Sequence, residues 1–265
     1  MTRNTLIGMA VCLLSGAAAC TKVIHTDLRS VPAKYVVEGN VTNLAGPYTV
    51  RITQTKNFEE DNTFPGVSGA TVTITDVQAA FTETLKEVSA GVYQTQQLQG
   101  KIGSTYQLQV NVGSNVFTAS STMPRQVPLD SIYVLDQALF GKIAKVIVPA
   151  YTDIPGQGDN YHFEQIINGN VDKTIYYGND DFTDGETNTF SLRRNDPDST
   201  LHVGDHVVIE MQNTDRPVYN YFYSMDQSAT GEGNGIPANP VTNITGGALG
   251  YFSAYTSQSR AITVK

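Results

Sequence analysis

The sequence predicts a mainly β protein: an immunoglobulin- or transthyretin-like sandwich followed by a second β-rich domain that carries one helix. Apolar and polar residues alternate over residues 48–53, 70–75 and 106–111, the pattern of strands buried on one face. Most of these residues are β-branched or aromatic, as in pleated sheets. Glycines separate the alternating segments and mark turns. The exception is residues 215–228, where the apolar residues follow a helical period.

The first 19 residues have the features of a signal peptide. Arg3 precedes a short apolar run over residues 6–14, and small residues fill positions 15–19. The apolar run is too short to span a bilayer as a permanent helix. Cys20 follows directly, so the segment resembles the lipobox of bacterial lipoproteins, in which this cysteine is acylated, for example with palmitate. Cleavage of an ordinary signal peptide after residues 17–19 is the alternative.

Composition restricts the function classes of the exported chain. Removal of residues 1–19 takes away one of 17 basic residues and none of 25 acidic ones, which leaves 246 residues with a net charge of −9. This balance argues against a nucleic-acid partner, which requires basic patches. If Cys12 is removed with the signal peptide and Cys20 is acylated, no thiol remains for a disulfide, a metal site or a nucleophile. Membrane attachment is expected through the lipid, with residues 20–33 as a lipidated tether.

Residues 34–124 are predicted to form the first β-sandwich. About seven short strands fit between residues 35 and 121, the number expected of an immunoglobulin-like domain. The Gly-Ala-x-Val-x-Ile pattern at residues 69–74, followed by Gly-x-Tyr at residues 91–93, resembles transthyretin-like or carboxypeptidase-regulatory-like domains. That resemblance implies a structural module and no particular chemistry.

Two prolines, Pro124 and Pro128, interrupt the alternation and place a domain boundary there. Residues 125–265 are then the second β-rich domain, with its clearest strands at 142–148, 161–167 and 207–211. The predicted helix near 215–228 has Asp215 as its N-cap and Pro217 in its first turn. Its apolar face consists of Val218, Tyr221, Phe222 and Met225, which we expect to pack on the second sheet.

The acidic segment 179–186 is the candidate metal site. Asp180, Asp181 and Asp184 offer closely spaced oxygen ligands, which suit Ca²⁺, although the spacing is not that of an EF-hand. A solvated acidic loop without a cofactor is the alternative. His202 and His206 are four residues apart, but the sequence between them predicts a turn, and no third ligand is in view.

The glycine-rich segments 231–240 and 246–252 are the candidate binding surface. Glycine lets the backbone approach a partner closely, and Tyr251 and Phe252 could anchor an interface. A tight turn into a buried strand is the alternative.

Several short motifs spread over the chain resemble one family. They are Tyr-Val-Val-Glu-Gly at 35–39, Gly-Pro-Tyr at 46–48, Val-Ser-Gly-Ala at 67–70, Ser-Thr-Met-Pro at 121–124, Val-Pro-Leu-Asp-Ser-Ile at 127–132 and Gly-Gly-Ala-Leu-Gly-Tyr-Phe at 246–252. Together they resemble DUF4249, an uncharacterised family of Bacteroidetes lipoproteins. The resemblance implies an outer-membrane lipoprotein, facing either side, often encoded beside a TonB-dependent receptor.

The expected function is therefore that of a non-catalytic accessory or binding component of a TonB-dependent uptake system. The sequence contains no Gly-x-Ser-x-Gly elbow, phosphate-binding loop or His-Glu-x-x-His motif. A surface adhesin or matrix lipoprotein is the alternative. A third hypothesis is a hydrolase, although the sequence does not show which two acids would form its catalytic pair.

The lipobox gives a direct prediction. Cys20→Ser should release the chain from the membrane fraction, because the residue that carries the acyl chains is lost. Cys12→Ser is the matched control and should leave attachment unchanged, since Cys12 lies in the segment that is removed. Fractionation followed by immunoblotting measures both, and full membrane retention of Cys20→Ser would disprove lipid attachment.

Overall fold

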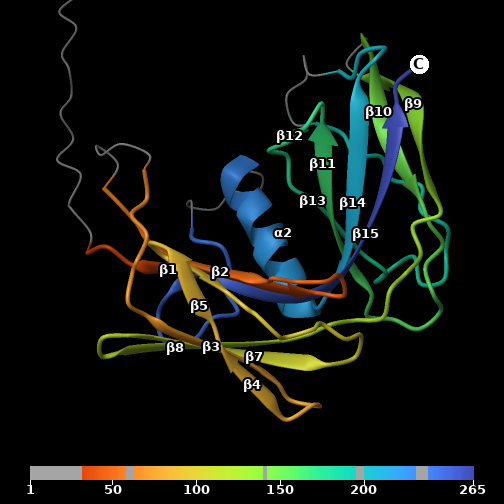
Figure 1. Ribbon diagram of the computed structural model, residues 1–265. Coiled ribbons are helices and arrows are strands. Elements are labelled where there is room, and N and C mark those ends of the chain that lie inside the picture. Colours follow the sequence, from red (N-terminus) through yellow and green to blue (C-terminus); the bar gives the residue numbers. More distant parts are fainter. Residues whose placement is uncertain (1–31, 58–62, 140–141, 195–199, 231–237) are drawn as a thin grey trace, which may run out of the picture. The chain divides into compact units, whose positions relative to one another are not determined.

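Strands from distant parts of the chain combine in one large sheet (Figure 1). The computed structural model describes residues 32–57, 63–139, 142–194, 200–230 and 238–265. Ala33–Lys265 forms one compact unit. Strands make up 50% of the structure and helix 7%, which confirms the mainly β fold class. Among the described residues, no helix is both long enough and apolar enough to cross a membrane.

The first eight strands form two layers. They are β1 (Tyr35–Thr42), β2 (Thr49–Gln54), β3 (Thr71–Asp76), β4 (Phe81–Thr84), β5 (Lys86–Ser89), β6 (Val92–Gln94), β7 (Thr105–Val112) and β8 (Asn115–Thr122). One layer has the order β1-β2-β6-β5, and the other is the four-stranded sheet β4-β3-β7-β8. The three alternating segments in the sequence are β2, β3 and β7. Their inward side chains are buried, as the period of two requires.

Side chains from both layers fill the first core. Its largest fully buried members include Tyr93, Tyr106 and Ile52. Tyr93 also connects the two parts of the transthyretin-like pattern. Its hydroxyl donates to the Val67 carbonyl at 2.8 Å and accepts from the Ala70 N–H at 3.0 Å. The two short motifs that are separate in the sequence therefore hold each other in place.

The remaining strands build the second half of the fold. They are β9 (Ser131–Leu139), β10 (Lys142–Ala150), β11 (Asn160–Ile167), β12 (Asn170–Val171), β13 (Tyr176–Asn179), β14 (His206–Thr214) and β15 (Leu249–Thr263). The strands predicted at 142–148, 161–167 and 207–211 are β10, β11 and β14. β9 and β10 form a separate hairpin, whereas β11 to β15 belong to the nine-stranded sheet. The second core includes Phe163, Ile209 and Leu192, all buried.

β15 joins the two halves. Residues 249–255 pair in parallel with β1, and residues 256–263 pair antiparallel with β14. The sheet therefore continues from β12 through β15 to β5 without a break. Phe252 and Ala254, on the first part of β15, are buried in the first core.

The segment around the predicted boundary lies between the two cores. Met123 is buried in the first core, whereas Val127 and Leu129 are buried in the second. Residues 244–254 belong to the predicted second domain by sequence but contribute to the first core. The first core therefore contains residues from both sides of the predicted boundary.

The helix α2 (Arg216–Thr230) lies where the sequence predicts one (Figure 1). The Val218 N–H donates to Asp215 Oδ1 at 3.2 Å, which confirms Asp215 as the N-cap. Asp215 Oδ2 accepts from Ser121 Oγ at 2.8 Å and from the Thr122 N–H at 3.0 Å, so the same carboxylate fixes the helix to β8. Val218, Tyr221 and Phe222 form a third buried cluster with Tyr251.

His162 lies beneath this helix on β11. Its ring stacks on Phe222 with centroids 3.8 Å apart, and its Nδ1 lies 3.1 Å from Gln212 Oε1. Burial lowers the pKa of His162 to about 4 and outweighs the opposing effect of the hydrogen bond to Gln212. The folded chain therefore keeps this imidazole neutral at mildly acidic pH.

This buried imidazole predicts a loss of stability on acidification. Between pH 6.5 and 4 the unfolded chain binds a proton on His162 that the folded chain does not bind. The free energy of unfolding should then fall by on the order of 3 kcal/mol over that window through this group alone. Chemical denaturation at several pH values should show a shallower dependence for His162→Gln. Equal slopes for His162→Gln and the unaltered protein would contradict the assignment.

Candidate functional site

The acidic segment 179–186 does not act as one cluster. Asp180 is 1% exposed, whereas Asp181 and Asp184 lie on the surface. Asp181 accepts two hydrogen bonds of 3.0 Å from Arg216, at the start of α2. Asp184 Oδ1 accepts from the Gly156 N–H at 2.7 Å. Of the three predicted ligands, only Asp180 belongs to a buried group of acids.

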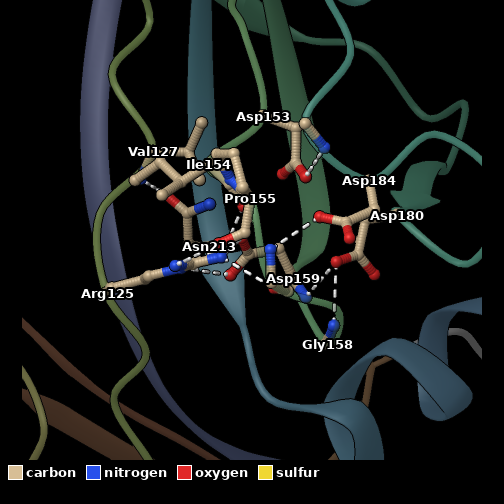
Figure 2. A network of polar contacts seen from close by, with 12 residues as sticks. Arg125, Val127, Asp153, Ile154, Pro155, Gly158, Asp159, Asp180, Asp184 and Asn213 are labelled. Atoms are coloured by element: carbon tan, nitrogen blue, oxygen red, sulfur yellow. Dashed lines mark hydrogen bonds and ion pairs between the residues drawn. The ribbon is translucent and has the colours of Figure 1, made fainter.

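Two acids outside the predicted segment complete that buried group. These acids are Asp153 and Asp159 (Figure 2). One carboxylate oxygen from each of them and one from Asp180 all lie within 4.8 Å of one another. Asp153 follows β10, Asp159 precedes β11 and Asp180 follows β13. We call these three residues the buried aspartate triad.

Strand register brings the triad together. β11 and β13 pair antiparallel with Asn160 opposite Asn179, so the residues just beyond this pair, Asp159 and Asp180, are neighbours. The Asp180 N–H donates to the Asp159 carbonyl at 3.2 Å. Asp153 joins through an isolated bridge between Thr152 and Thr187, beside which its N–H donates to the Glu186 carbonyl at 2.9 Å.

Arg125 binds one member of the triad. Its guanidinium contacts both oxygens of Asp159, at 2.7 to 3.2 Å. The same group donates to the carbonyl oxygens of Ile154 at 2.6 Å, Gly156 at 2.8 Å and Pro155 at 3.4 Å. Arg125 belongs to the segment around the predicted domain boundary. Its ion pair with Asp159, together with the burial of Val127 and Leu129, fixes this segment to the second half of the fold.

The other two carboxylates of the triad accept hydrogen bonds from different partners. Asp153 accepts from the Tyr161 hydroxyl and from the Gly185 N–H, the latter at 3.0 Å. Asp180 Oδ2 accepts from the N–H groups of Gly158 at 2.8 Å and Asp159 at 3.1 Å. Burial raises the pKa of Asp159 above its usual value despite Arg125. Burial, with Asp153 next to it, also raises the pKa of Tyr161.

Sequence reasoning missed Asp153 and Asp159. The available signal was the glycine-rich turn at residues 155–158 between two predicted strands, with an aspartate at each end. The acidic segment 179–186 reaches the same edge of the sheet only because the strand before it, β13, pairs with β11. β13 is four residues long and was not predicted, so the sequence did not reveal this pairing.

Neither of the two predicted binding aromatics is exposed. Phe252 is fully buried in the first core, so the structure corrects its assignment as a surface anchor. Tyr251 is largely covered by α2, with its ring 4.7 Å from Tyr221 and 5.2 Å from Phe222 between centroids. Gly246 adopts φ +91° and packs against the Val116 carbonyl, where a Cβ atom would lie 2.2 Å from the oxygen. Gly246 therefore lies in a tight turn before β15, which is the second interpretation given above for this segment.

Three further predictions have simple outcomes. His202 is exposed, and its Nδ1 lies 3.8 Å from Asp205 Oδ2 in a turn. Among the described residues the candidate metal group contains neither His202 nor His206. Cys20 lies outside the described residues, as does segment 231–237 of the predicted binding surface.

Comparison with known proteins gives a family and no activity. Residues 21–261 match the family described as "Domain of unknown function (DUF4249)". No curated protein matches the chain.

Removal of the cation from the Arg125–Asp159 pair should cause a measurable loss of stability. Arg125→Met should lower the free energy of unfolding by about 2 kcal/mol, because it leaves the side chain of Asp159, which is 5% exposed, without its cation. Loss of one partner of a fully buried pair costs roughly 3–5 kcal/mol, and the smaller figure reflects the 39% exposure of Arg125. Urea denaturation followed by circular dichroism measures the change.

Arg216→Met is the matched control for this prediction. Its pair with Asp181 has similar geometry, but the two side chains are 49% and 41% exposed, so the expected loss is below about 1 kcal/mol. Equal losses in the two variants would show that burial of Asp159 does not determine the effect.

Proposed function

The chain belongs to the DUF4249 family, whose function is unknown, and from this premise we propose that it is a non-catalytic, lipid-anchored binding protein of the outer membrane. In this proposal it serves as an accessory component of a TonB-dependent uptake system. Two features support the proposal: the lipobox at Cys20 and an uncharged groove on the four-stranded sheet. The groove is the observation on which the binding role depends.

The groove has a volume of ≈ 680 Å³, within the range of small-ligand sites. It lies over the outward face of β3, β7 and β8. Its walls come from the start of α2 and from the segment before β15. It is lined by Thr73, Thr75, Gln107, Leu108, Gln109, Thr118, Ala119, Ser120, Pro217, Asn243 and Thr245.

Strand register arranges the polar side chains of the groove in two rows. Thr73 pairs with Gln109, which pairs with Thr118 on the next strand. The neighbouring row is Thr75, Gln107 and Ser120. Paired residues in a sheet project to the same face, so each row presents a hydroxyl, an amide and a second hydroxyl side by side.

The chemistry of these rows favours a neutral ligand rich in hydroxyl groups. Hydroxyl and amide side chains both donate and accept hydrogen bonds, as sugar hydroxyls do. The described lining contains no charged side chain, so an ionic ligand would lose its water without gaining a counter-charge. We therefore assign the groove to a neutral oligosaccharide.

Attachment to the membrane gives such a site a use even when each contact is weak. A lipid anchor restricts the chain to the membrane surface, which raises its effective concentration next to any membrane protein there. A ligand held in the groove would thus be delivered close to a neighbouring receptor. The tether expected at residues 20–33 would supply the reach.

This proposal predicts two separable interactions. Full-length tagged protein from gently solubilised outer membranes should co-purify with a TonB-dependent receptor and should bind members of an array of neutral oligosaccharides. Ser120→Arg should weaken oligosaccharide binding by roughly tenfold or more, because a long charged side chain then fills the groove. Receptor recovery should remain, since the groove is not assigned to the receptor.

Thr71→Arg is the matched control for the groove. Thr71 lies on β3, is exposed like Ser120, and does not line the groove. It should bind the array as the unchanged protein does. Recovery of the chain without any receptor would exclude the accessory role, and self-association of the protein in that case would favour a surface adhesin.

A further inference from the structure

The buried aspartate triad carries more negative charge than its protein partners neutralise. Arg125 forms an ion pair with Asp159 at 2.7 Å. In the described part of the chain, neither Asp153 nor Asp180 forms an ion pair. All three aspartates are at most 4% exposed, so water screens this charge poorly. The arrangement leaves two buried carboxylates that a cation would stabilise.

One carboxylate oxygen of the triad has no hydrogen-bond partner in the part of the chain that the structure describes. Asp180 Oδ1 is buried and has no hydrogen-bond partner among the described residues. Among the described residues, it is the only buried carboxylate oxygen without a hydrogen-bond partner. Glu83 is the contrasting case: it is 8% exposed, and both of its oxygens accept backbone N–H groups, from Gln96, Gln97 and Leu98.

We propose that Asp153, Asp159 and Asp180 bind a calcium ion through one oxygen of each carboxylate. Carboxylate oxygens are hard ligands, which Ca²⁺ and Mg²⁺ both prefer. The carboxylates are held by backbone N–H groups of Gly158, Asp159 and Gly185, and they come from three separate segments. Such an irregular oxygen set suits the flexible coordination of Ca²⁺ better than the strict octahedron that Mg²⁺ requires.

The position of Arg125 is compatible with this ion. Figure 2 shows Arg125 reaching Asp159 from one side, with Asp153 and Asp180 on the other. Its guanidinium is already engaged with Asp159 and with carbonyl oxygens of residues 154–156. The ion would therefore neutralise the side of the triad that Arg125 does not contact.

Terbium and calcium provide the test. The chain has no tryptophan, so tyrosine excitation is the source of sensitised Tb³⁺ luminescence, and the Tyr161 hydroxyl is bonded to Asp153. Full-length protein in detergent should give a luminescence signal that Ca²⁺ competes away at concentrations where Mg²⁺ does not. Ca²⁺ at about ten times its dissociation constant should raise the melting temperature by roughly 3–5 °C, since it binds the folded state.

Two isosteric variants localise the ion. Asp180→Asn retains an oxygen that can accept the N–H groups of Gly158 and Asp159 but removes the charge, so it should abolish both signals. Asp181→Asn alters the adjacent, exposed aspartate and should retain both.

Three outcomes would overturn the proposal. They are an unchanged melting curve of the unaltered protein in millimolar Ca²⁺, equal competition by Mg²⁺, and a retained response in Asp180→Asn. Circular dichroism identifies a variant that fails to fold. In that case Asp153→Asn, read by terbium competition, decides the question in its place. None of these outcomes depends on oligosaccharide or receptor binding.

Discussion

The pairing of β15 with two different strands is the constraint on which the rest of the structure depends. The first part of β15 completes the layer that begins with β1, and the second part supplies an edge for β14. Gly250 permits the close approach to β1: it adopts φ +95°, and a Cβ atom there would lie 2.0 Å from the Val37 carbonyl oxygen. Because one strand serves both cores, a disturbance of β15 affects both halves of the fold.

Carboxylates at the junctions of elements fix the parts attached to this sheet. Asp215 caps α2 and binds β8, and Asp159 holds the segment that contains Arg125. Burial raises the pKa of both carboxyl groups above the usual value, so their hydrogen bonds only partly offset the cost of desolvation. These contacts determine where elements join more than they add to stability, whereas apolar burial in the two cores supplies most of the driving force.

Much of the local structure could be predicted from the sequence because local patterns determine it. The alternation in β3 and β7 follows from a sheet with one buried face, and the face of α2 follows from residues spaced three and four apart. The partners of these elements could not be predicted in the same way. Asp153 and Asp159 meet Asp180 only through the register of short strands, and Phe252 is buried because β15 returns to β1. Both are pairings between distant segments, to which periodicity is insensitive.

The same return of β15 has a consequence for the order of folding. Ser257 bonds to Asn43, 214 residues earlier in the chain, and this contact lies next to the parallel pairing with β1. A topology dominated by such distant contacts folds slowly, because long loops must close before the contacts form. The N-terminal layer cannot be completed until β15 has been synthesised. A nascent chain of this kind therefore keeps one edge of β1 unpaired until β15 is available to it.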